Sequence, residues 1–391
     1  MAGQLKHFFN EQLVHSLADE LQRAYPPLRK AAFVAACTKG LAGLELMARG
    51  GHLAEVMYDH LPRPFARAAE VLVASLGPEL ARSDAFGMAP FRYLPHVLYV
   101  QRYGLDDFEA AMRAQYEITK RFSAETSIRA FLEKYPETAY ARLREWARDG
   151  NVHVRRLVSE GTRPRLPWAP RLRAFQDDPR PVITLLEMLK DDPERYVQRS
   201  VANNLNDVAK DHPALVVEIC RRWSADAPPA RRWIVKHALR SLVKKGHRGA
   251  LAILGVEGKP RVSVSAVRFV PRRPRVGDAL RFSFEIASLS QKPQELLVDY
   301  TVHFVKANGI ARPKTFKLRR IKLPALGRTE FGSTVSLANM TTRSHYPGRH
   351  RIDALVNGVI YPLGTVDVRA GSRSPASQRI SAGRPGSPPP P

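Results

Sequence analysis

The 391-residue sequence contains little cysteine and no long apolar run. Cys37 and Cys220 are its two cysteines, far apart in segments with helical periodicity. This usage excludes a disulfide framework and a cysteine metal quartet, and it predicts two buried thiols. No apolar stretch approaches the roughly 20 residues of a membrane span, and the first ten residues, MAGQLKHFFN, lack the apolar core of a signal peptide. We therefore expect a soluble protein of the reducing cytoplasm.

The common catalytic signatures are also missing. The sequence has no P-loop, GxGxxG, HExxH, CxxC or GxSxG motif. Its 12 histidines are scattered, and His345 and His350, which flank a turn, are expected at the surface. These absences exclude the usual nucleotide-binding, zinc-peptidase and serine-hydrolase patterns, so no metal or small-molecule cofactor is predicted.

Positive charge is the first feature that indicates a function. Lys and Arg number 62 against 37 Asp and Glu, a net charge of +25. Residues 257–391 carry 23 basic and 8 acidic side chains, whereas residues 1–256 carry 39 and 29, so the second region is more basic per residue. A field of this size favours a polyanionic partner, with nucleic acid the first candidate. An anionic membrane surface and simple solubility remain as alternatives.

Two regions of different periodicity follow one another, and 44% of the residues are hydrophobic, enough for a substantial core. Residues 1–256 show apolar residues at three- and four-residue spacing, broken by proline pairs, which predicts helices throughout. Residues 257–262 are expected to form a linker. Residues 263–369 alternate with period two between turn signals such as Asn357-Gly358, which predicts an immunoglobulin-like sandwich of about seven strands. The Pro- and Ser-rich residues 370–391 are expected to be a disordered basic tail.

The helical region contains an internal repeat. Residues 149–161 align with residues 192–204, and residues 229–241 make a third copy. Offsets of 43 and about 37 residues between helical copies are typical of HEAT and armadillo solenoids. Arg156, Arg199 and Lys236 hold equivalent places and are expected to line one face as a basic stripe. The alternative is that these cations cap helices or pair with acids.

One segment combines a carboxylate with many cations. In residues 155–170, RRLVSEGTRPRLPWAP, a helix is expected to end at Gly161, and a proline-containing loop follows it. Glu160 has four arginines around it in sequence, and Trp168 lies in the loop. The next repeat, SVANNLNDVAKDHP, places Asn203 and Asn204 opposite Glu160 and Gly161, with Asp207 one turn later. The four polar residues of NNLND are poor helix formers, which indicates that they are kept for their polar groups.

These strings, with WIVKHALRSLVKKG, resemble the HEAT-repeat DNA alkylation-repair glycosylases of the AlkC branch over residues 1–255. The motif at 155–172 is specific, and an appended immunoglobulin-like domain is similar to that of one AlkC subgroup. The resemblance implies a monofunctional DNA N-glycosylase that releases 3-methylcytosine, 1-methyladenine and 3-methyladenine in base excision repair. It further implies double-stranded DNA carrying alkylated bases as partner, no cofactor, and a monomer associated with the bacterial nucleoid.

The resemblance also implies roles for individual residues. The catalytic carboxylates match Glu160 in SEG and Asp207 in LND, and a further acid at the lesion site matches Glu125 in RFSAETSIR. Trp168 in LPWAP matches the site aromatic, and Arg156 matches the phosphate-binding arginine. The other side chains expected to contact DNA are Arg163, Arg165, Arg199, Lys236, Asn203, Asn204, Arg272 and Arg273.

The chemistry agrees with these residue types. A cationic alkylated base leaves without protonation, and the positive charge moves to the sugar as the bond breaks, so a nearby carboxylate stabilises the transition state. The chief alternative is a non-enzymatic HEAT scaffold that binds nucleic acid or acidic proteins. An RNA-directed repeat protein also fits the charge, but aromatic-rich base-stacking motifs are missing.

Overall fold

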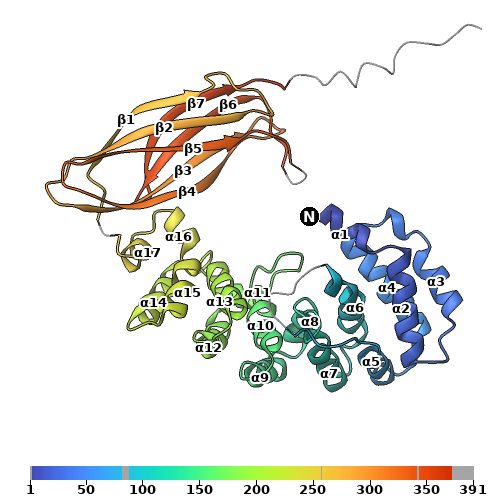
Figure 1. Cartoon of the computed structure of the whole chain (residues 1–391). Helices are drawn as coiled ribbons and strands as arrows, with labels where there is room; N and C mark the ends of the chain where they lie inside the picture. Colours follow the sequence, from blue (N-terminus) through green and yellow to red (C-terminus); the bar gives the residue numbers. More distant parts are fainter. Residues whose placement is uncertain (1, 82–87, 257, 341–342, 372–391) are drawn as a thin grey trace, which may run out of the picture. The chain divides into compact units, whose positions relative to one another are not determined.

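The computed structural model describes residues 2–81, 88–256, 258–340 and 343–371. A helical region is followed by an all-β region of two sheets, as expected from the periodicity (Figure 1). The chain divides into two compact units at Leu242 and Val243. Residues 243–256, which the sequence pattern places at the end of the helical region, therefore group with the strands. Most of the expected tail, residues 372–391, lies outside the described residues.

The first unit consists of short helices packed in two rows (Figure 1). In chain order they are α1 (Ala2–Phe8), α2 (Glu11–Ala24), α3 (Lys30–Thr38), η1 (Leu41–Gly43), α4 (Leu46–His60), α5 (Phe65–Ala74), η2 (Ala89–Tyr93), α6 (Leu94–Tyr103), α7 (Phe108–Thr119), α8 (Ser127–Lys134), α9 (Pro136–Trp146), α10 (Val152–Gly161), α11 (Arg173–Asp177), α12 (Arg180–Leu189), α13 (Arg195–Val208), α14 (Pro213–Ser224) and α15 (Pro229–Ala238). Then come α16 (Arg240–Lys244), which spans the division, and α17 (Arg248–Ile253).

Local sequence signals set where these helices begin. Asn10, Asp107 and Asn151 cap α2, α7 and α10, because each side chain accepts a hydrogen bond from a backbone N–H of the first turn. Proline in the first turn of α9, α12, α14 and α15 fixes the backbone without losing a helical hydrogen bond. One apolar stripe of each longer helix is buried, so the core runs through the unit between the two rows.

The three sequence copies correspond to α10, α13 and α15, with the start of α16 completing the third. α13 packs against both α10 and α15, and α12 and α14 cover this row from one side (Figure 1). The Asn204 amide donates hydrogen bonds to the carbonyl of Ser159 at 2.8 Å and to the Thr162 hydroxyl at 3.2 Å. This asparagine therefore joins α13 to the end of α10.

The β-strands form a sandwich of two antiparallel sheets. One sheet has the order β1-β2-β5 and the other β4-β3-β6-β7. The strands are β1 (Val262–Val270), β2 (Ala279–Ser288), β3 (Gln294–Val305), β4 (Ala311–Leu323), β5 (Arg328–Ser336), β6 (Gly348–Val356) and β7 (Val359–Val368). Asn357 and Gly358 join β6 to β7 with φ angles of 49° and 76°, which favour these two residue types. Inward-facing residues such as Phe284, Leu296 and Ile352 fill the space between the sheets.

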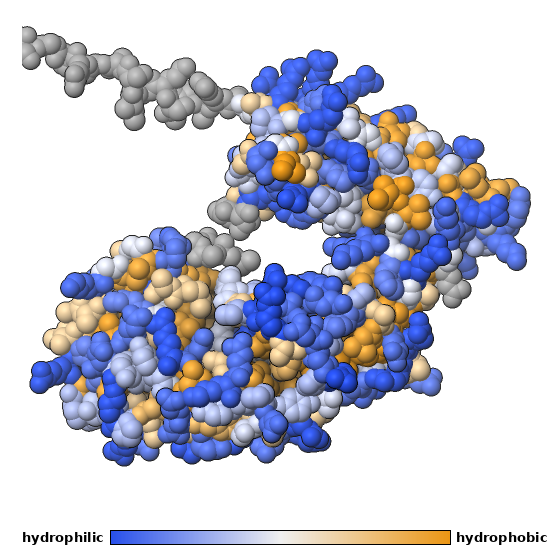
Figure 2. All heavy atoms as spheres, turned by 180° about the vertical axis from the view of Figure 1, so that it is seen from behind, coloured by the Kyte–Doolittle hydropathy of each residue, from blue (hydrophilic) through white to orange (hydrophobic). Residues whose placement is uncertain are grey.

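Burial corrects one expectation and confirms another. His345 and His350, expected at the surface, are 6% and 2% exposed and pack edge-on against Phe304. Cys37 and Cys220 are buried free thiols, and burial raises the pKa of each to about 12. Within the described residues, no helix is long and apolar enough to cross a bilayer. Hydrophilic side chains cover much of the face in Figure 2, with apolar patches scattered among them.

Candidate active site

A single guanidinium joins two buried carboxylates from neighbouring repeats. Arg163 follows α10 and donates from Nη1 to Glu160 Oε1 at 2.6 Å and from Nε to Asp207 Oδ2 at 2.9 Å. Glu160 lies in the last turn of α10 and Asp207 in the last turn of α13, and both side chains are less than one-tenth exposed. Lys210 contacts the other oxygen of Asp207 at 2.8 Å. Two acids 47 positions apart in sequence thus share one cation.

The surroundings of Glu160 keep its carboxyl ionised. Burial raises the pKa of Glu160. The charges of Arg156 and Arg163 and the hydrogen bonds from Ser200 and Arg163 lower it by more, so the net pKa lies below the ordinary value. The Ser200 hydroxyl of α13 donates to Oε2 at 2.6 Å. A fixed negative charge in a largely desolvated place acts more strongly on a neighbouring cation than it would in water.

Arg156 connects Glu160 to a third carboxylate. It lies 3.5 Å from Glu160 and forms a close ion pair with Glu125, which precedes α8. Burial lowers the pKa of Arg156, but Glu125, Glu160 and Tyr196 raise it, and the net shift is upward. Its guanidinium also lies 5.1 Å from the centre of the Tyr196 ring, a cation–π contact. Glu125, Glu160 and Asp207 are thereby linked through two arginines.

A pocket of about 280 Å³ lies beside this cluster. Glu125, Arg156 and Tyr196 form its polar wall, and Trp168 and Pro167 of the loop after α10 border it. Trp168 is 60% exposed and has a φ of 63°, the left-handed region that non-glycine residues rarely adopt. The remaining wall is mainly apolar and includes Leu46, Met47, Phe91, Leu94 and Phe122. An exposed indole therefore stands at the edge of a pocket that carries a carboxylate.

Comparisons with known proteins identify the family of this chain. Residues 120–242 match the model of the DNA alkylation repair enzyme family, and residues 263–370 match the C-terminal Ig-like domain of the uncharacterised protein YhaZ. The YhaZ protein of Bacillus subtilis is 34% identical over 360 residues, which cover 91% of this chain and 97% of that protein. The Pseudomonas fluorescens alkylpurine DNA glycosylase AlkC, solved on DNA containing an abasic site analog, is 36% identical with a TM-score of 0.85, over 94% of this chain and 99% of its own. This chain belongs to the AlkC family of DNA alkylation repair glycosylases.

The candidate site contains some of the expected residues and leaves others outside. Of the four arginines near Glu160 in sequence, Arg156 and Arg163 contact it. The other two pair elsewhere, Arg155 with Asp192 and Arg165 with Asp211. These two acids come from the segment before α13 and the segment after it, so each arginine is drawn to a different end of the neighbouring repeat.

The expected basic stripe has unequal members. Arg156 is held by acids, whereas Arg199 and Lys236 are exposed, and neither has a carboxylate partner among residues 2–81, 88–256, 258–340 and 343–371. Asn203 accepts a hydrogen bond from Arg240 at 3.0 Å, and Asn204 serves the repeat interface described above. Arg272 and Arg273, in the second unit, are exposed on the segment after β1.

Sequence reasoning missed three residues of the candidate site. Ser200 holds Glu160, Tyr196 faces Arg156, and Lys210 holds Asp207. Each lies on or directly after α13, within two turns of a residue that was singled out. Pairing the polar positions of consecutive repeats along facing helices could have indicated them.

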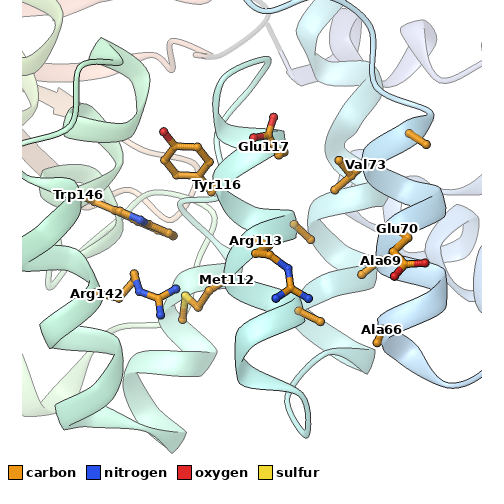
Figure 3. A pocket seen from close by; sticks show the side chains of 13 residues that line it. Ala66, Ala69, Glu70, Val73, Met112, Arg113, Tyr116, Glu117, Arg142 and Trp146 are labelled. Carbon is orange, nitrogen blue, oxygen red and sulfur yellow. The ribbon is translucent and has the colours of Figure 1, made fainter.

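A second pocket lies on other elements of the same unit (Figure 3). It has a volume of about 450 Å³ and lies between α5, α7 and α9. Alanines, Met112 and Trp146 form most of its wall, with Arg113 and Arg142 beside them (Figure 3). The residues that line it include none of those expected from the resemblance. The carboxylate cluster is therefore the candidate active site.

Proposed function

We propose that this chain hydrolyses the N-glycosidic bond of cationic alkylated bases in double-stranded DNA, with 3-methylcytosine, 1-methyladenine and 3-methyladenine as its substrates. It acts as a monofunctional glycosylase at the first step of base excision repair. The observation that carries the proposal is the pair of buried carboxylates, Glu160 and Asp207, held by Arg163 beside the Trp168 pocket. The AlkC relative solved on DNA with an abasic site analog supports it, because an abasic site is the product of base release.

The carboxylates perform the chemistry. The alkylated base carries a positive charge and leaves as a neutral molecule, so the electron deficit moves to the deoxyribose. An ionised carboxylate close to the sugar stabilises this cation and orients or deprotonates the attacking water. We assign these two duties to Asp207 and Glu160, and the low pKa of Glu160 keeps it ionised at neutral pH. Glu125, at the pocket wall, is the third acid of the lesion site.

The aromatic and basic residues bind the DNA. Trp168 offers an exposed ring face to the sugar or the cationic base. Arg199 and Lys236 neutralise phosphates along the row of repeats, and Arg272 and Arg273 do so in the second unit. Arg156, Arg163, Arg165, Asn203 and Asn204 are proposed to contact the DNA around the lesion once it is bound.

The reaction as proposed needs water and the side chains of this chain alone, without a cofactor. Since the substrate is chromosomal DNA, we place the protein in the bacterial cytoplasm, at the nucleoid. We propose that one copy suffices, because every residue assigned to the reaction belongs to one unit of one chain.

Base release from methylated DNA tests the proposal. The wild-type chain should free alkylated bases and leave alkali-labile abasic sites. Asp207→Asn and Glu160→Gln should each slow release by about 100-fold or more while lesion DNA remains bound. Asp211→Asn is the matched control, since Asp211 pairs with Arg165 of the same loop but lies outside the carboxylate cluster. Tight binding without release by the wild type would instead identify a scaffold, and wild-type rates in both variants would remove the carboxylates from the mechanism.

A further inference from the structure

A buried arginine of α8 holds the segment that carries Arg163 and Trp168. Arg129 is 3% exposed, and its guanidinium donates to the carbonyl oxygens of Gly161 at 3.0 Å and Arg163 at 2.7 Å. A further short hydrogen bond reaches the carbonyl of Pro170. One side chain therefore contacts the backbone at both ends of the loop that follows α10.

The charge of Arg129 is not balanced by a contacting acid. No carboxylate among the residues described forms an ion pair with it, although the charges of Glu133, Arg163, Glu125 and Asp207 act on it from beyond contact distance. Burial lowers the pKa of Arg129 to about 10. Desolvating a cation without an ion pair is costly, and backbone carbonyls compensate for the lost water only as long as the loop keeps this path.

The three carbonyls belong to residues at or beside the candidate site. Arg163 is the residue whose side chain joins Glu160 to Asp207. Pro170 lies two residues after Trp168, whose φ of 63° marks a backbone that is held in an uncommon conformation. Glycine is required at position 161, because a Cβ there would lie 2.5 Å from a side-chain carbon of Ile128. The end of α10 and the loop after it thus pack closely against α8.

We propose that Arg129 is a positioning residue for base release. It fixes the backbone of residues 161–170 and thereby sets where Arg163 holds the two carboxylates and where Trp168 borders the pocket. This inference rests on the proposed glycosylase function. A displacement of about 1 Å in such a group is enough to cost on the order of 100-fold in rate. The loss should therefore fall on the chemical step, with DNA affinity little changed.

The chain supplies a matched control for a purely structural arginine. Arg49 of α4 is 5% exposed and, like Arg129, donates only to backbone carbonyls, those of Lys6, Phe9, Ala42 and Leu44. These carbonyls belong to the N-terminal helices and their connections, remote in sequence from the carboxylates. Removing Arg49 therefore disturbs a similar buried hydrogen-bond network but leaves the contacts of residues 161–170 with Arg129 in place.

The experiment compares Arg129→Ala and Arg49→Ala in the full-length chain. Single-turnover base release from an oligonucleotide with 3-methyladenine is measured across protein concentrations, which separates the maximal rate from the half-saturating concentration. Unfolding temperatures report the stability of each variant. We expect Arg129→Ala to lower the maximal rate about 100-fold and to change half-saturation less than about threefold. Arg129→Lys, which keeps the charge with fewer directed donors, should recover about tenfold of that loss. Arg49→Ala should lose stability but keep the wild-type maximal rate.

Each outcome decides the matter. An active wild type with an Arg129→Ala rate equal to that of Arg49→Ala overturns the positioning role and leaves the proposed function intact. A wild type that releases no base overturns the proposed function itself. If Arg129→Ala does not fold, Arg129→Lys and Arg129→Gln take its place, and a wild-type maximal rate in whichever of them folds overturns the inference.

Discussion

Arg156 and Arg199 occupy the same place in consecutive repeats but have opposite environments. Arg156 lies between Glu125 and Glu160 and faces the Tyr196 ring. Arg199, 43 positions later, is exposed. The two repeats therefore share an arginine at this place, but the residues around it differ.

The difference comes from three positions outside the arginines themselves. Where the first copy has Glu160, the second has Asn203, which is neutral and accepts a hydrogen bond from Arg240. The segment before α8 adds Glu125 and Ser123 to the Arg156 side. The arginine at this place thus joins an ion-pair cluster where a neighbouring segment supplies acids, and it is exposed where none is supplied.

The largest expected difference between the two arginines is in the rate of base release. Arg156→Gln should slow base release by about 100-fold, because the pocket wall loses its cation and two carboxylates lose a partner. Arg199→Gln should stay within about threefold of the wild-type rate, since its loss removes a phosphate contact at most. Saturating single-turnover assays measure both. Equal losses in the two variants would show that the repeats are functionally alike.

The second test measures how stability depends on pH. The folded-state pKa of Glu160 lies below the ordinary carboxyl value of 4.5, so its contribution to stability is present above that pH and is lost as the pH falls through the folded-state pKa. Glu160→Gln should cost about 3 kcal/mol of unfolding free energy at pH 7, and the gap to the wild type should narrow below about pH 4.5. Urea unfolding at several pH values measures this gap. Asn203→Ala, at the equivalent place, should give a gap that does not change with pH, and a constant gap for Glu160→Gln would contradict the assignment.

The smallest effect concerns salt. Replacing Arg199 and Lys236 together by Gln should weaken binding to DNA of any sequence and reduce the slope of log affinity against log salt by about 2. Arg272→Gln with Arg273→Gln should do the same if the second unit also contacts phosphates. Binding isotherms from 50 to 200 mM salt serve as the measurement. Arg231→Gln is the control, because Asp191 already neutralises Arg231; a slope lowered as much by this variant would argue against direct phosphate contacts.

Much of the fold follows from local patterns in the sequence. The period-two alternation after residue 260 predicted about seven strands, and β1 to β7 lie in this region, because alternate side chains of each strand face one core. The spacing of the three helical copies likewise gave α10, α13 and α15. The expectation for His345 and His350 was wrong because flanking a turn says nothing about a ring such as Phe304 that packs from another strand.

The site could be predicted only in part. The sequence indicated Glu160, Asp207 and Trp168, but it did not show that Arg155 and Arg165 pair with acids of the adjacent repeat. Arg129 carries no signal of its own, since its partners are backbone carbonyls, which every residue possesses. Contacts of a side chain with a distant backbone, such as those of Arg129, therefore leave no pattern in the sequence, whereas the repeat spacing does indicate contacts between equivalent positions of neighbouring repeats.

The position of the two carboxylates on successive helices has a mechanical consequence. Glu160 belongs to α10 and Asp207 to α13, so the gap between them is set by how one repeat stacks on the next, with Arg163 and the Ser200 hydrogen bond spanning it. Any change in curvature between these repeats alters that gap directly. The packing of α10 against α13 therefore fixes the distance between the two proposed catalytic carboxylates, and a change in that packing should change the rate of base release.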